Sequence, residues 1–181
     1  MHNLSGINAV NVYITQLLII KKEETNGEFP ITPGSGAFII AIVNMIGCIC
    51  ALLPMRLIGR KPILMLGYGG LSVSLFVIGL AYLKEWNLLM FITVSVYTFI
   101  FQITVGGCTW FYTAETTLDK SMGVCIFVQF LWLIIIVGTF EFIISSPLGT
   151  HGSFWVFAAI MFFGFLFTAL AVKETKGKTD L

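Results

Sequence analysis

The residues best suited to chemistry are polar side chains that interrupt long apolar runs. Asn8, Asn11 and Thr15 follow one another at intervals of three and four, so an α-helix carries them on one face. Asn44 and Gln102 stand inside two later apolar runs. Amide groups are costly in lipid, and their donors and acceptors suit the hydroxyl groups of a sugar. The same groups also suit a second role, as hydrogen-bonded contacts between neighbouring helices.

Glu141 is the one carboxylate that stands well inside an apolar run, toward the end of that run. Burial raises the pKa of a carboxyl group, so proton coupling is one interpretation. A side chain that faces a cavity or reaches the membrane surface is the other, and the shallow position favours it. The two histidines, His2 and His151, stand at opposite ends of the chain and complete no Cys–His or Ser–His–Asp set. The sequence therefore predicts no catalytic residue, metal site, cofactor or enzyme activity.

The elements that carry these residues are predicted to be membrane-spanning helices. Hydrophobic residues make up 57% of the 181 residues and charged residues only 10%, whereas a soluble domain carries about 25% charged residues. A spanning helix needs about 20 mostly apolar residues. Six runs meet this requirement, at residues 4–20, 35–56, 62–83, 86–112, 121–144 and 153–172. We expect an all-α integral membrane protein, with residues 1–181 forming a single bundle of six transmembrane helices.

The distribution of lysine and arginine predicts the orientation of these helices. With six spans, both termini lie on one side, together with seven basic residues, against three on the opposite side. Cytoplasmic loops carry an excess of Lys and Arg, so both termini are expected in the cytoplasm, or in the matrix if the membrane is mitochondrial. Membrane lipid is the expected surrounding. A net charge of +1 gives no electrostatic reason to expect nucleic acid as a partner.

Several motifs, in order along the chain, resemble the sugar porters, which form the glucose-transporter branch of the major facilitator superfamily. They are Leu4-Ser5-Gly6-Ile7-Asn8 with Tyr13 for the seventh helix, Asn44 for the eighth, Gly59-Arg60-Lys61 for the loop after it, Trp110 and Ala114-Glu115 for the tenth, Trp132 for the eleventh, and Glu174-Thr175-Lys176-Gly177 for the C-terminal signature. The resemblance implies one six-helix bundle, equivalent to helices seven to twelve of a twelve-helix fold. Substrate in that fold lies between two bundles.

The resemblance also implies roles for two groups of residues. Contacts to a small polar solute are expected from Asn3, Asn8, Tyr13, Asn44, Gln102 and Trp110. A cytoplasmic charge network that latches the two bundles is expected from Arg60, Lys61, Glu115, Lys120 and Glu174. The alternative for the charged residues is a set of local surface pairs, each worth about 0–1 kcal/mol.

Two departures from the family pattern affect these expectations. His2 and Asn3 stand where the family has a Gln-Gln pair whose amides bind sugar. Val105, Gly107 and Thr109 stand where the tenth helix has prolines. Prolines break and flex that helix, so we expect a straighter strut in this chain.

Two functions remain as hypotheses. In the first, the chain pairs with itself or with a separate six-helix bundle and transports a sugar or similar small solute. In the second, it no longer transports and serves as a structural subunit of a larger membrane complex, for example in an organelle inner membrane. The sequence leaves open whether the chain is a natural half-length product or a fragment.

Overall fold

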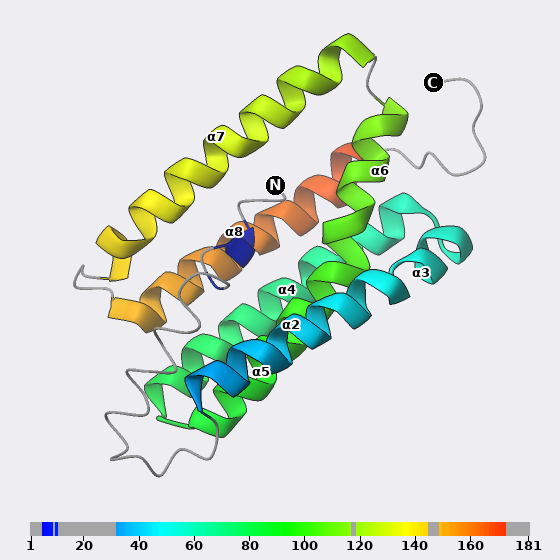
Figure 1. Ribbon diagram of the computed structural model, residues 1–181. Coiled ribbons are helices and arrows are strands. Elements are labelled where there is room, and N and C mark those ends of the chain that lie inside the picture. Colours follow the sequence, from blue (N-terminus) through cyan, green and yellow to red (C-terminus); the bar gives the residue numbers. More distant parts are fainter. Residues whose placement is uncertain (1–4, 9, 11–31, 117–118, 145–148, 173–181) are drawn as a thin grey trace.

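The computed structural model describes residues 5–8, 10, 32–116, 119–144 and 149–172. Every regular element within these residues is a helix (Figure 1). In chain order the elements are α2 (Pro33–Cys50), α3 (Leu52–Leu57), α4 (Arg60–Leu83), α5 (Asn87–Phe101), the π-helix η2 (Gln102–Gly106), α6 (Gly107–Thr116), α7 (Asp119–Ile144) and α8 (Gly149–Ala171). The predicted all-α fold class is confirmed.

Five stretches of the described chain are long and apolar enough to cross a membrane. They are Gly34–Pro54, Arg60–Leu83, Asn87–Glu115, Ser121–Thr139 and Gly149–Ala171, and they match the second to sixth predicted spans. The first predicted span, at residues 4–20, lies mostly outside the described residues. Its opening is described: Ser5 lies in a 3₁₀ turn and Gly6 has a φ of +78°. Among the described residues of this opening, regular helix begins at Ile7.

Local sequence explains both ends of α2. The hydroxyl oxygen of Thr32 accepts a hydrogen bond from the backbone N–H of Ser35 at 3.3 Å, and Pro33 occupies the first helical position. A threonine cap and a proline at this position both favour a helix start. α2 ends at Cys50, four residues before Pro54. A proline ring collides with the carbonyl group four residues earlier and donates no N–H, so the regular helix stops there.

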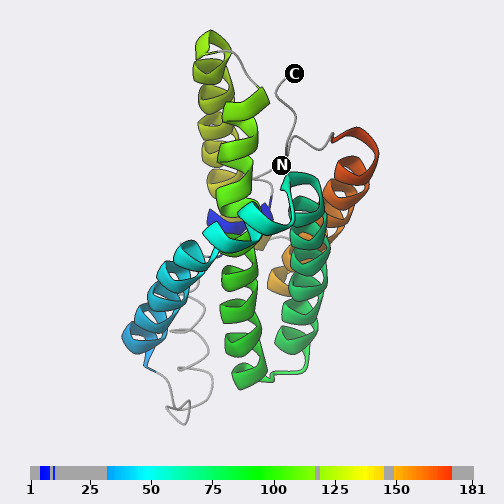
Figure 2. The ribbon, with the colours of Figure 1, turned by 90° about the vertical axis from the view of Figure 1, so that its right-hand side faces the viewer.

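The most extensive contact within the described bundle joins α4 and α8, which run antiparallel. Gly79 on α4 packs against Trp155 near the start of α8, and Tyr68 packs against Gly164 further along α8. The missing side chains at these glycines let the two helices approach closely. Figure 2 shows α4 and α8 at one edge of the bundle, α2 at the opposite edge, and α5 and α6 between them.

The fourth predicted span is helical throughout but not α-helical throughout, and the prediction of a straighter strut stays a prediction. α5 ends at Phe101, the π-helix η2 follows, and α6 completes the span. Thr98 and Thr104 each donate a side-chain hydrogen bond to the carbonyl group four residues earlier. Such bonds compete with the regular backbone ladder and often bend helices. The span therefore has an irregular centre without any proline.

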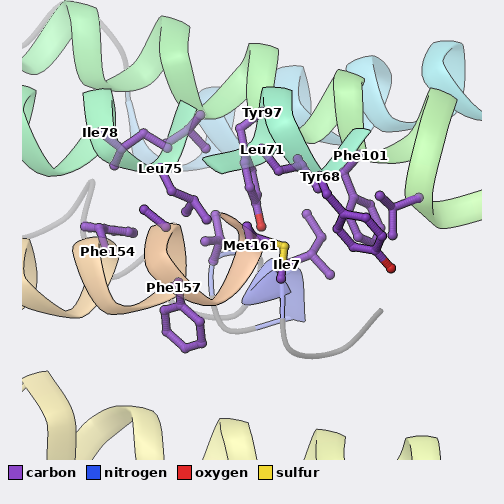
Figure 3. Packing of buried hydrophobic residues seen from close by; sticks show 14 of the residues in the cluster. Ile7, Tyr68, Leu71, Leu75, Ile78, Tyr97, Phe101, Phe154, Phe157 and Met161 are labelled. Carbon is purple, nitrogen blue, oxygen red and sulfur yellow. The ribbon is translucent and has the colours of Figure 1, made fainter. Parts of the chain in front are cut away.

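The core lies between α4, α5 and α8 (Figure 3). Side chains that are at most 1% exposed include Leu71, Leu75, Tyr97, Phe154 and Met161. The hydroxyl group of Tyr97 donates a hydrogen bond to the backbone carbonyl of Ser5 at 2.8 Å. Gly6 places its backbone against the ring of Phe157 on α8. The opening residues of the chain are therefore fixed to both α5 and α8.

α7 lies along the outside of the bundle and runs beside α8 (Figure 1). Only 6% of its membrane-spanning window is buried. Its contacts are chiefly with α8 and α6. Most of its apolar surface therefore faces lipid or another membrane protein, as a helix that is apolar on all sides requires.

Candidate functional site

Two amide side chains meet where α2 crosses the π-helix η2. Nε2 of Gln102 donates a hydrogen bond to Oδ1 of Asn44 at 2.5 Å. Asn44 is the middle residue of the span Gly34–Pro54, and Gln102 is one residue past the middle of the span Asn87–Glu115. The pair therefore lies near the midplane, where an unsatisfied polar group costs several kcal/mol. The structure thus places Asn44 and Gln102 in contact, although they were predicted as site residues on two different spans.

Two glycines make the space in which the Gln102 side chain lies. A Cβ atom at Gly47, three residues after Asn44, would lie 2.9 Å from Cβ of Gln102. A Cβ atom at Gly106 would lie 2.6 Å from Oε1 of Gln102. Both distances are shorter than real Cβ contacts allow, so any larger residue at these positions displaces Gln102. Neither glycine was predicted as a site residue, although their spacing of three and four from the amides was a usable signal.

The amide pair keeps hydrogen-bonding capacity after this one bond. Gln102 retains a second N–H and its carbonyl oxygen, and Asn44 retains both of its N–H groups. Both side chains are half-buried rather than sealed in the core. Because each sugar hydroxyl is both a donor and an acceptor, this mixture of groups suits a polyhydroxyl solute.

A second candidate site joins α4 and α6 at the end of the bundle predicted to face the cytoplasm. The guanidinium of Arg60 binds the carboxylate of Glu115 through Nε, at 3.2 Å from both oxygens, and through Nη2, at 2.5 Å from Oε1. The two side chains are 22% and 33% exposed. Gly59, with a φ of +103°, turns the chain directly before α4, a conformation that favours glycine. The structure therefore shows the ion pair between Arg60 and Glu115, whereas its role in latching two bundles stays a prediction.

Lys61 contacts a different helix from its neighbour Arg60. Its Nζ donates a hydrogen bond to the backbone carbonyl of Ala169 at 2.9 Å, in the last turn of α8. The carbonyl groups of a last turn lack partners within the helix, and a cation there also interacts favourably with the helix dipole. The first turn of α4 therefore holds α6 through Arg60 and α8 through Lys61.

The other predicted site residues are placed only in part. Asn8 is half-buried in the opening segment, and Trp110 lies on α6 with 38% of its surface exposed. Outside the described part of the chain lie Asn3, Tyr13 and Glu174, together with the side chains of Lys120 and Glu141. Their predicted roles stay predictions.

The arrangement of helices is that of one bundle of a major facilitator transporter. The chain matches the proton:xylose symporter XylE bound to 6-bromo-6-deoxy-D-glucose with a TM-score of 0.84 at 20% identity, over 98% of this chain and 38% of that one. It matches the xylose transporter XylE from E. coli, in a partially occluded inward open conformation, with a TM-score of 0.74 at 21% identity, over 99% and 43%. At these identities the similarity shows the fold alone.

The protein-family model "Sugar (and other) transporter" matches residues 1–180, so the chain belongs to this family of sugar porters. The facilitated trehalose transporter Tret1 of Drosophila yakuba is 30% identical over 190 residues, which cover 97% of this chain and 21% of that protein. Tret1 of Culex quinquefasciatus is 28% identical, covering 97% and 35%. The chain thus spans about a fifth to a third of the length of these curated relatives. The predicted family is confirmed, and the relatives are transporters rather than enzymes.

Proposed function

We propose that residues 1–181 form one bundle of a sugar porter, which moves a sugar or similar small polar solute when paired with a second six-helix bundle. The main support is the Asn44–Gln102 pair near the membrane midplane, in a chain of the sugar-transporter family. Solute sites of such transporters lie near the midplane, at the interface between repeats. Relatives named for trehalose and neighbours named for xylose favour a sugar as the solute.

In this proposal the two amides bind solute hydroxyl groups from one wall of the passage. Asn8 and Trp110 extend that wall, and Asn3 and Tyr13 complete it from the part of the chain outside the described residues. The irregular centre of the α5–η2–α6 span carries Gln102. Because the backbone hydrogen bonds of a π-helix depart from the regular α-helical pattern, this segment offers a place for the span to bend as the passage opens and closes.

An exposed apolar stripe on α2 offers the surface for the second bundle. Its members recur every three or four residues, so they share one helix face: Phe38, Ile42, Met45 and Ile49. They are between 38% and 67% exposed, on the helix at the edge of the described bundle opposite α4 and α8 (Figure 2). The lengths of the solved porters, of which this chain covers 38–43%, leave room for such a partner.

The charged end of the bundle is assigned to the cytoplasmic or matrix side in the same proposal. The Arg60–Glu115 pair lies there, and Lys61, Lys120 and Glu174 belong to the same predicted network. Exchange of these contacts between the two bundles would favour one conformation of the transporter over the other. Ion pairs at the membrane surface suit this use, because each one contributes little and is easily exchanged.

Uptake into proteoliposomes tests the proposal. The full chain is reconstituted alone and together with the co-expressed N-terminal bundle of a Tret1 relative, and entry of radiolabelled trehalose, glucose and xylose is measured. We expect uptake above that of empty liposomes only when both bundles are present. In the paired sample, Gln102→Leu is expected to abolish most of the uptake.

Ser95→Ala is the matched control for the Gln102 substitution. It removes a polar group from the same span, but the hydroxyl group of Ser95 donates within its own helix, to the carbonyl of Phe91. We expect this variant to transport normally. A stable complex of both bundles without uptake of any sugar would overturn transport and favour the structural-subunit function. Uptake by the chain alone would overturn the requirement for a different second bundle and favour pairing of the chain with itself.

A further inference from the structure

An apolar groove lies between α4 and α8, away from the amide pair and the charged end. Its volume is about 480 Å³, within the range of about 300–1,000 Å³ typical of small-molecule sites. The described residues that line it are Ser72, Val73, Phe76, Trp155, Ala158, Ala159 and Phe162. Both helices belong to membrane spans, so this groove opens to the hydrocarbon of the bilayer.

The shape of the groove follows from the sizes of its residues. Small side chains line part of it, with Ser72 contributed by α4 and Ala158 and Ala159 by α8. Aromatic rings close one end, where Phe76 stacks on Trp155 with 6.0 Å between ring centroids. Phe162, seven residues after Trp155, lines the groove further along α8. At 1.5 Å per residue, these two aromatic residues are about 10 Å apart along the helix axis.

The groove offers no polar group to an occupant. The hydroxyl of Ser72 donates to the backbone carbonyl of Ala158 at 2.8 Å and is satisfied within the helix pair. The indole nitrogen of Trp155 is buried against Gly79 instead of facing the groove. The described lining residues carry no charge. An occupant that needs a hydrogen bond would lose it here, so the groove suits a hydrocarbon.

The groove begins in one leaflet and reaches the bilayer midplane. Trp155 lies six residues and Phe162 thirteen residues after Gly149, where α8 begins, which places the groove about 9–20 Å from that end. The Arg60–Glu115 pair is at the opposite end of α4. Ser72 stands at the middle of α4 and Phe162 lies two residues past the middle of α8, so the groove extends from the leaflet on the far side from that ion pair to the bilayer midplane.

Charges at the outer end of the helix pair match a zwitterionic headgroup. α4 ends at Leu83, and Lys84 and Glu85 follow it as exposed residues. Because α4 and α8 are antiparallel, both residues lie at the end where α8 begins. One cation and one anion side by side complement a phosphate and an ammonium group held on the same lipid.

We propose that the α4–α8 groove binds one acyl chain of a zwitterionic phospholipid from the leaflet opposite the Arg60–Glu115 pair. The elongated apolar hollow holds the chain parallel to α8, and Lys84 and Glu85 face the headgroup. The bound lipid fills the gap between two helices whose own contact is the most extensive in the bundle. It therefore acts as part of the packing of α4 on α8.

Quenching of tryptophan fluorescence by brominated lipids tests this site. The full chain, with Trp86→Phe, Trp110→Phe and Trp132→Phe, keeps Trp155 as its single reporter in nanodiscs. Phosphatidylcholine brominated on one acyl chain is titrated into unlabelled phosphatidylglycerol. A second chain carries Trp155→Phe and Phe163→Trp, which moves the reporter to an exposed position of α8 outside the groove.

We expect half-maximal quenching of Trp155 at about a tenfold lower fraction of brominated lipid than for the Phe163→Trp reporter. A tenfold enrichment corresponds to a preference of about 1.4 kcal/mol. Equal titration curves for the two reporters would show ordinary bilayer contact and overturn the site. Preferential quenching by a brominated sterol or by brominated phosphatidylglycerol, but not by phosphatidylcholine, would overturn the assignment of the occupant.

A groove-filling variant separates occupancy of the groove from altered folding. Ala159→Leu adds bulk to the groove from an exposed position. It is expected to remove the enrichment at Trp155, while helix content by circular dichroism stays unchanged. Unchanged enrichment at Trp155 in this folded variant would place the lipid elsewhere and contradict the proposal.

Discussion

Gly67 on α4 lies against the π-helix η2 so closely that it offers a sharp test of the packing. A Cβ atom at this position would lie 2.5 Å from Oγ1 and 2.7 Å from Cβ of Thr104, and 2.9 Å from Cγ2 of Val105. Real Cβ atoms essentially never approach other atoms below 3.0 Å. Both opposing side chains are β-branched, which leaves them little rotamer freedom to move aside. Gly67→Ala therefore forces α4 and η2 apart.

The expected magnitude comes from comparison with a glycine that faces open space. Gly138 in α7 has nothing within 4 Å of its built Cβ atom. Gly→Ala gains about 1 kcal/mol of helix preference at an interior position, and this gain is common to Gly67→Ala and Gly138→Ala. The difference between the two variants isolates the overpacking cost, which is about 1–3 kcal/mol. We expect Gly67→Ala to unfold more easily than Gly138→Ala by this amount.

Equilibrium unfolding of the full chain in mixed detergent micelles measures the difference. Helicity is followed as the fraction of dodecyl sulfate is raised, and the two variants are compared with the parent chain. Thr104→Ala, added to Gly67→Ala, removes the nearest atom and is expected to restore part of the loss. Equal unfolding of Gly67→Ala and Gly138→Ala would refute the close approach of α4 to η2.

Three further predictions concern the polar contacts. A double-mutant cycle of Asn44→Leu and Gln102→Leu in the same unfolding assay should give a coupling of about 0.6–1.7 kcal/mol; zero coupling would contradict the hydrogen bond. Glu115→Gln should lower the free energy of unfolding by at most about 1 kcal/mol, and by less at high salt. Adding Arg60→Gln to this variant should cause little further loss. Losses that add in full would exclude the ion pair. Lys61→Met should speed hydrogen exchange in the last turn of α8, with Lys61→Arg as the control, whereas unchanged exchange would contradict the cap.

Much of the fold was predictable because the bilayer simplifies the problem. Apolar runs of about 20 residues identified the second to sixth spans, since each backbone group in lipid is satisfied within its own helix. The charged and turn-forming residues at Gly59-Arg60-Lys61 and Lys84-Glu85 marked the helix ends correctly. Ordered motifs predicted the family, and the comparison over residues 1–180 confirms it.

The interior of the fourth span was less predictable from the sequence. No proline marks the centre of this span, yet the π-helix η2 replaces regular α-helix at Gln102–Gly106. Hydroxyl groups of Thr98 and Thr104 bond to the backbone of their own helix. Such bonds depend on the side-chain rotamer, which neighbouring helices select. The residue types were visible in the sequence, but the rotamers were not.

The sequence by itself determined which polar residues lie within the membrane. An amide that stands inside an apolar run of spanning length must lie in the bilayer, and both features are read directly from the sequence. Tertiary structure alone decided which of them meet. Gln102 reaches Asn44 across 58 positions of sequence because Gly47 and Gly106 leave room for it. Likewise Lys61 is directed to α8 rather than to Glu115, although it adjoins Arg60. Partners on different helices depend on crossing points, and these are fixed by packing of side chains far apart in the chain.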